Sequence, residues 1–127
     1  MSDPLFQKVD CIMLHVPDLD AALRFYRDEL GHELVWRHGD KAAAVRLGES
    51  ELVLNAERKE AEVDIQVESA VQAAARFVRA GGRIIAGPFD IRIGKCVVVS
   101  DPWGNRLVLL DTTKGMLRTD DRGNVIG

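Results

Sequence analysis

The segment Asp10–Gly31, DCIMLHVPDLDAALRFYRDELG, shares its pattern of residues with Ala61–Gly82, AEVDIQVESAVQAAARFVRAGG, 51 residues later. The matched positions keep their chemical character and their order: Val16 with Val67, Ala22 with Ala73, Tyr26 with Phe77, Gly31 with Gly82 and Leu34 with Ile85. Ordered matches at one offset indicate an internal duplication. The sequence therefore predicts two copies of one structural unit.

The duplication continues beyond these segments, with a small change in spacing. Leu52–Leu54 matches Leu107–Leu109 at an offset of 55 residues. The additional residues fall in Asp101–Asn105, DPWGN, whose proline, glycine and asparagine are typical of a turn. We therefore expect the second copy to differ from the first by a longer turn before its last strand.

Each copy has the hydrophobic pattern of one strand, one helix and three further strands. Along residues 10–16 and 62–67, alternate side chains would lie on opposite faces, a pattern that predicts half-buried strands. Asp18 and Ser69 are predicted helix N-caps, and Gly31 is predicted to end the first helix. The remaining strands are expected at residues 33–37, 42–47 and 51–55 in the first copy, and at 83–85, 95–100 and 106–110 in the second.

These elements predict an α+β fold made of two β-α-β-β-β units. We expect a single domain over residues 1–127, with a first unit at about 9–57, a second at about 61–112 and a C-terminal tail at 113–127. The two units would pair into an eight-stranded, cup-shaped sheet with the helices outside. The concave side would form a pocket for a small molecule, and the tail would form a short hairpin or a dimer contact.

Composition excludes several classes of function. The chain has 127 residues and a net charge of −3, without a stripe of Lys and Arg, so we expect no binding to nucleic acid. We expect no membrane span, because no apolar run approaches about 18 residues, and the N-terminus is unlike a signal peptide. Two distant cysteines, Cys11 and Cys96, do not make a disulfide framework. A cytoplasmic location is expected.

Three segments resemble the vicinal oxygen chelate superfamily, which contains glyoxalase I, extradiol dioxygenases and the fosfomycin- and bleomycin-resistance proteins. They are Asp10–Leu19, Phe25–Gly31 and Asp101–Leu107, and the resemblance covers residues 9 to about 111. It implies the same cup-shaped fold and a homodimer. The fold hosts several chemistries and some plain binders, so the resemblance does not choose among them.

The resemblance also implies a divalent metal ion held by four positions of the cup. In this chain those positions are Cys11, Val53, Glu62 and Val108. Valine cannot coordinate a metal ion, and two remaining ligands of unlike softness are fewer than such sites use. We therefore expect no metal cofactor.

The residues expected to face the cup are candidates for ligand binding: Cys11, Met13, His15, Val53, Glu62, Asp64, Gln66, Trp103 and Val108. Among them His15 and Glu62 are candidate acid–base groups. Each has a plainer interpretation, since His15 could lie at a solvated rim and Glu62 could face water. Trp103 could cap a ligand, anchor a dimer or pack on its own chain. Arg37, His38 and Arg92 could meet an anionic substrate, or be solvated.

Three functions remain open at this point. The first is a metal-free protein that binds a small molecule in the cup, resembling the bleomycin-resistance type. The second is a glyoxalase-like lyase or isomerase, with metal assembled from Cys11, Glu62 and neighbours, or with His15 and Glu62 acting without metal. The third is a protein with a vestigial pocket that binds a partner through a dimer face. We favour the first, which is not an enzyme.

Overall fold

The computed structural model describes residues 3–126 of the chain, and these form two compact units. Neither unit is continuous in sequence. The first unit comprises residues 11–62 together with residues 117–126, and the second comprises residues 63–116 together with residues 3–10. Most of the tail that follows the second β-α-β-β-β copy, from Leu117 on, therefore belongs structurally to the first unit.

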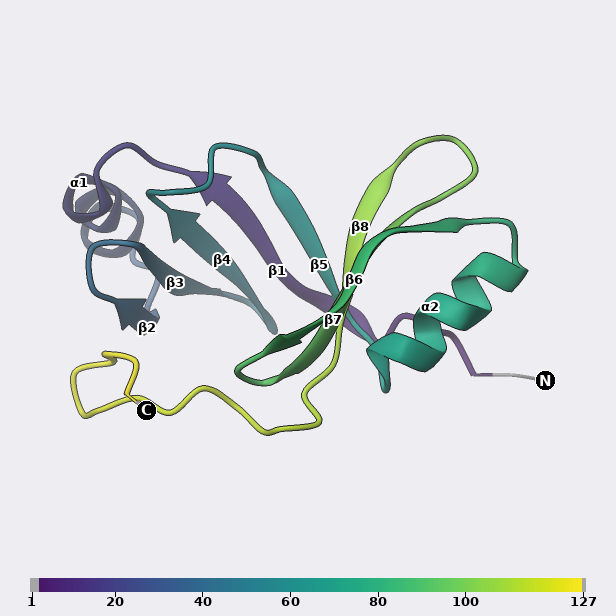
Figure 1. The fold of residues 1–127 in the computed structure, drawn as a ribbon. Coiled ribbons are helices and arrows are strands. Elements are labelled where there is room, and N and C mark those ends of the chain that lie inside the picture. Colours follow the sequence, from purple (N-terminus) through teal and green to yellow (C-terminus); the bar gives the residue numbers. More distant parts are fainter. Residues whose placement is uncertain (1–2, 127) are drawn as a thin grey trace. The chain divides into compact units, whose positions relative to one another are not determined.

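The first unit has four strands and a helical segment (Figure 1). Its strand order is β2-β3-β4-β1, in which β1 and β4 are parallel and the other neighbours are antiparallel. The elements are β1 (Lys8–His15), α1 (Leu19–Leu23), a π-helical stretch η1 (Arg24–Glu29), β2 (Leu34–His38), β3 (Ala42–Leu47) and β4 (Ser50–Asn55).

The second unit repeats this arrangement with the strand order β5-β8-β7-β6. Its elements are β5 (Glu62–Gln66), α2 (Ala70–Arg79), β6 (Arg83–Ile91), β7 (Gly94–Ser100) and β8 (Arg106–Leu110). The register of the parallel pairs repeats as well, since Met13 lies opposite Val53 and Asp64 lies opposite Val108. These pairs are related by the offsets of 51 and 55 residues, so the duplication and the α+β class are confirmed.

The two helices begin where the sequence predicts but differ in regularity. Asp18 accepts a hydrogen bond from the Ala21 amide at 3.2 Å, and Ser69 accepts one from Gln72 at 3.3 Å, so both are N-caps. The first helix is not α-helical throughout, contrary to the expectation. From Arg24 it widens to a π-helix, because the Leu30 amide donates to the carbonyl of Phe25 five residues earlier.

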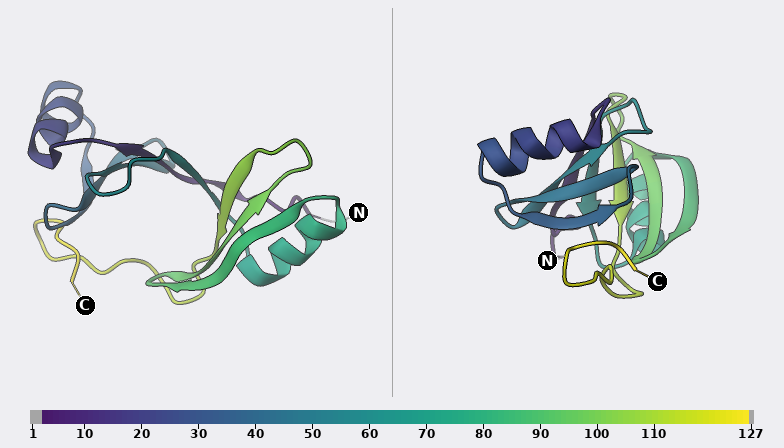
Figure 2. Two further views of the ribbon diagram at one scale, coloured as in Figure 1. Left: turned by 45° about the horizontal axis from the view of Figure 1, so that its top comes forward. Right: turned by 90° about the vertical axis from the view of Figure 1, so that its left-hand side faces the viewer.

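In each unit the helix covers one face of its strands, and the core lies between them (Figure 2). Leu23, Val45 and Leu54 are almost fully buried in the first unit, as are Val99 and Leu109 in the second. The first core contains Leu19, Ala22, Leu23, Ala43, Val45 and Leu54, and the second contains Ile65, Val67, Ala70, Ala73, Ala74, Val97, Val99 and Leu109.

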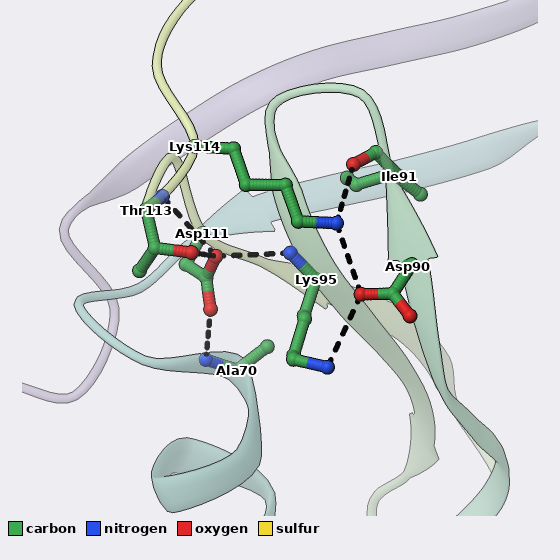
Figure 3. A network of polar contacts seen from close by, with 7 residues as sticks. All are labelled: Ala70, Asp90, Ile91, Lys95, Asp111, Thr113 and Lys114. Carbon is green, nitrogen blue, oxygen red and sulfur yellow. Dashed lines mark hydrogen bonds and ion pairs between the residues drawn. The ribbon is translucent and has the colours of Figure 1, made fainter.

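Asp111, which follows β8, anchors the start of α2 (Figure 3). Only 2% of the residue is exposed. Its carboxylate accepts hydrogen bonds from the amides of Ala70 at 2.7 Å and Lys95 at 3.0 Å, and from the Thr113 hydroxyl at 2.8 Å. Burial raises the pKa of Asp111, but these donors outweigh it and hold the pKa below its usual value.

The tail forms a hairpin-like turn on the outer edge of β2. Thr119 and Val125 form an antiparallel bridge, and Asn124 bridges Arg37 in parallel. The tail thus adopts the hairpin that the sequence analysis gave as one of two alternatives. No helix among the described residues is long and apolar enough to cross a lipid bilayer.

Candidate functional site

The face of the first unit that lies opposite α1 carries most of the predicted site residues of that unit. Side chains alternate along a strand, so Cys11, Met13 and His15 share one face of β1. In the parallel neighbour β4, their partners in register are Glu51, Val53 and Asn55. We call the surface formed by these residues, with Ala44 and Trp36 on the next two strands, the open face.

The floor of the open face is apolar and buried although the helix lies on the other side of the strands. Cys11 and Val53 are each 4% exposed, and Ala44 is fully buried. Met13 and Trp36 pack against this cluster, together with Val35. Of the predicted ligand-binding residues, Cys11, Met13 and Val53 are therefore brought together here.

Polar groups surround this floor at defined positions. The Trp36 indole Nε1 donates to the Glu51 carboxylate at 3.0 Å in a half-buried contact. The Asn55 side-chain amide lies 3.8 Å from the Met13 sulfur. His15 is exposed, and its Nδ1 lies 3.1 Å from the carbonyl oxygen of Asn55, which can only accept, so Nδ1 carries the proton. In the neutral ring the Nε2 atom of His15 is then an acceptor.

Sequence reasoning missed Glu51 and Asn55, which contribute polar atoms to this face. It placed a ligand position of the last strand at Val53, to act together with Cys11, and gave no role to the neighbouring Glu51 and Asn55. In the structure Cys11 lies directly opposite Glu51, two residues earlier on β4. The alternation of β4 places Glu51 and Asn55 on the same side as Val53 and could have drawn attention to them, but the register between two strands is not visible in one sequence.

Glu62 is only partly exposed to water, whereas its plainer interpretation expected it to face water. Its side chain is 18% exposed, and its Oε1 forms an ion pair with Arg58 at 3.1 Å. Arg37, proposed for an anionic substrate, is likewise engaged, because its guanidinium donates to Asp20 at 2.9 Å and to the carbonyl of Gly39 at 2.9 Å. His38 and Arg92 are exposed.

In the second unit the corresponding face carries Asp64, Gln66 and Val108. Asp64 is 7% exposed and lies opposite Val108, and Gln66 donates from its side chain to Gln7 at 3.2 Å. Trp103 lies on the turn before β8 and is 83% exposed. Trp103 is thus presented to solvent.

The donor atoms of this chain do not fit a metal ion at the positions the resemblance implies. Val53 and Val108 are buried aliphatic residues without donor atoms. Beside Cys11, the carboxylate of Glu51 is engaged by the Trp36 indole. Within residues 3–126, no three side chains of His, Cys, Asp or Glu form a group that could hold a metal ion. The residues at these positions therefore do not support a reaction on a bound metal ion.

Comparison with known proteins agrees with the duplicated fold. A hypothetical protein from Bacillus halodurans has a similar structure, with a TM-score of 0.71 and 19% sequence identity over 87% of this chain and 98% of that one. The methylmalonyl-CoA epimerase of Mycobacterium tuberculosis has a TM-score of 0.68 and 16% identity over 89% of this chain and 93% of its own. At these identities the likeness shows the fold alone.

Two comparisons of sequence show the family as well as the fold. An uncharacterized protein from Mycolicibacterium smegmatis is 34% identical over 119 residues, which are 90% of this chain and 99% of that protein. The model of the Glyoxalase/Bleomycin resistance protein/Dioxygenase superfamily matches residues 8–109. The chain therefore belongs to the Glyoxalase/Bleomycin resistance protein/Dioxygenase superfamily.

Proposed function

We propose that this protein binds a small organic molecule on the open face of its first unit, without a metal ion. One observation carries the proposal: a buried apolar floor of Cys11, Ala44 and Val53 lies beside the hydrogen-bonded pair of Trp36 and Glu51, on the side of the strands away from the helix. An apolar floor with a few oriented polar groups is the usual composition of a ligand site.

The chemistry of this face favours a ligand with a flat apolar body. The half-buried Trp36 offers a rigid ring for stacking, and the partly buried Met13, which packs against the buried Cys11 and Val53, offers apolar contact. Glu51 can accept a hydrogen bond from the ligand, and His15 Nε2 adds a second acceptor at the exposed end of β1. The Oδ1 atom of Asn55 already accepts from the amides of Glu57 and Arg58 at 2.8 and 2.7 Å. A molecule with an aromatic ring and donor groups would use all of these contacts.

A thermal-shift screen followed by calorimetry tests this proposal. The panel contains small aromatic diols, glycopeptide antibiotics, methylglyoxal adducts and methylmalonyl-CoA, each with and without EDTA, and turnover is assayed on every compound that binds. We expect at least one compound to bind equally well with EDTA. Trp36→Leu and Glu51→Gln should each weaken it about tenfold. Val78→Ala, at an exposed position of α2, serves as the control.

Two results would overturn the proposal. One is a stoichiometric divalent ion in protein purified without chelator that is lost on substitution Glu62→Ala. The other is turnover of a bound compound that disappears in His15→Gln or Glu62→Gln, which would establish the lyase or isomerase instead.

A further inference from the structure

We infer that the C-terminal segment Leu117–Ile126 is an edge clamp that positions Trp36 for the ligand. The inference rests on the proposed function and deepens it, because it adds a segment outside the duplicated units to the machinery of that site. The clamp is defined by its backbone contacts to β2, the strand that carries Trp36.

The clamp binds the residue next to Trp36 through both of its backbone groups. The amide of Arg37 donates to the carbonyl of Gly123 at 2.7 Å, and the carbonyl of Arg37 accepts from the amide of Val125 at 2.7 Å. Figure 1 shows the tail beside β2. The first bond holds the peptide group that joins Trp36 to Arg37, and the second holds the peptide group that joins Arg37 to His38. Together they restrain the backbone of β2 from which the indole projects.

The clamp is internally stiff because one carboxylate organises its turn. Asp120 accepts from the amides of Arg122 and Asn124, each at 2.9 Å, and from the Asn124 side chain at 3.2 Å. Gly123 takes a left-handed conformation with φ +84°, and a side chain there would press on Leu34 of β2. The turn is therefore shaped to fit against this edge.

On the other side of β2, the side chain of Arg37 is held to the helix and the β2–β3 turn by Asp20 and Gly39. The Trp36 indole in turn donates to Glu51 on β4. Loosening the clamp would free one backbone edge of β2, so the position of the indole would depend on the Trp36–Glu51 bond and on its packing against the apolar floor. We expect the ring to sample other positions and the ligand to bind less tightly.

The chain contains a matched control for this idea. Asp101 organises an equivalent turn, DPWGN, by accepting from the amides of Trp103 and Asn105 and from the Asn105 side chain. The two turns share the pattern Asp-x-x-Gly-Asn, but the turn of Asp101 precedes β8 and carries Trp103. Asp120→Ala and Asp101→Ala remove the same bonds, and each turn is adjacent to one of the two tryptophans.

Fluorine NMR of the full chain labelled with 5-fluorotryptophan, together with amide hydrogen exchange, tests the clamp. We expect Asp120→Ala to shift the Trp36 signal and to speed exchange at Arg37 about fivefold or more. Asp101→Ala should shift the Trp103 signal instead. Asp120→Asn should restore the original Trp36 signal, since an asparagine oxygen can still accept both amides. An unmoved Trp36 signal in folded Asp120→Ala would overturn the inference.

Measurements of ligand binding by the same variants distinguish a failure of the clamp hypothesis from a failure of the proposed function. With a compound that binds the wild type, Asp120→Ala should weaken binding about fivefold while Asp101→Ala leaves it unchanged. Equal binding by both variants would overturn the clamp's role in ligand binding. If no compound of the panel binds the wild type, the proposed function fails, whereas the fluorine signals still decide whether the clamp positions Trp36.

Discussion

The two units share a topology but differ in how their helices are anchored and how their edges are covered. The second unit holds the start of α2 with the buried carboxylate of Asp111, whereas the first unit has Ala56 at the position related by the offset of 55 residues. Its α1 relies on the exposed cap Asp18 and changes to a π-helix after five residues. The duplicated sequence thus fixes the order of strands and helices, and single polar residues decide how firmly each helix is held.

The outer edge strands of the two units, β2 and β6, also differ. The outer edge of β2 is occupied by the tail, which supplies hydrogen bonds to both backbone groups of Arg37. β6 is the last strand of its unit, and its register with β7 shifts twice, near Ala86. It also contains Pro88, which has no amide to donate. Irregular pairing and proline are ways to discourage further strand addition, so each unit protects its edge by different means.

The largest effect that would sharpen this comparison is expected from Asp111→Ala. The substitution leaves the buried amide of Ala70 and the partly buried amide of Lys95 without their acceptor, so the free energy of unfolding should fall by about 3 kcal/mol. Chemical denaturation in urea measures it. Ser69→Ala, which removes only the local cap of the same helix, is the matched control and should cost about 1 kcal/mol. Equal losses in the two variants would show that Asp111 is not the main anchor.

The anchoring of α2 should also depend on pH. Because the folded state lowers the pKa of Asp111, its contribution is complete above the unfolded pKa of about 3.9 and is lost as the pH falls through the lower folded value. The difference in unfolding free energy between the wild type and Asp111→Asn should therefore be largest near neutral pH and shrink below about pH 4. Denaturation at a series of pH values measures it, and a difference that grew on acidification would contradict this assignment.

The smallest effect is expected in the first unit. Asp18→Ala removes one exposed cap bond, to the amide of Ala21, and should lower the free energy of unfolding by about 1 kcal/mol. Asp18→Asn keeps a side-chain oxygen and should cost less. If Asp18→Ala destabilised the protein as much as Asp111→Ala, the contrast between a firmly and a loosely anchored helix would be wrong.

The sequence predicts the fold well because the fold depends on patterns that repeat. The alternating residues of the strands, the helix N-caps and the glycine that ends the first helix indicate where the units lie. The strand at Ala42–Leu47 is found as predicted. β6 is longer than expected, running to Ile91, because Gly87 and Pro88 are typical of a break yet lie inside a bulged strand. The π-helical stretch has no pattern of its own, since its spacing of apolar residues also suits an α-helix.

The candidate site was less accessible to prediction. The open face depends on the register between β1 and β4, in which the residue directly opposite Cys11 is Glu51 and not Val53. The pair of Trp36 and Glu51 joins strands that are not neighbours in the sheet, so no local pattern indicates it. The role of the tail depends on a contact between residues more than eighty positions apart in sequence, Arg37 and Asn124. The metal-free state, the homodimer and the cytoplasmic location remain predictions.

The discontinuous units have a consequence for synthesis on the ribosome. The first unit lacks its edge partner until residues 117–126 have been made, after the whole second unit has been translated. During that interval the backbone of β2 around Arg37 is available to other chains as well as to solvent. A stop codon after the second unit would release a chain whose two β-α-β-β-β copies are complete but whose strand β2 has an unprotected edge.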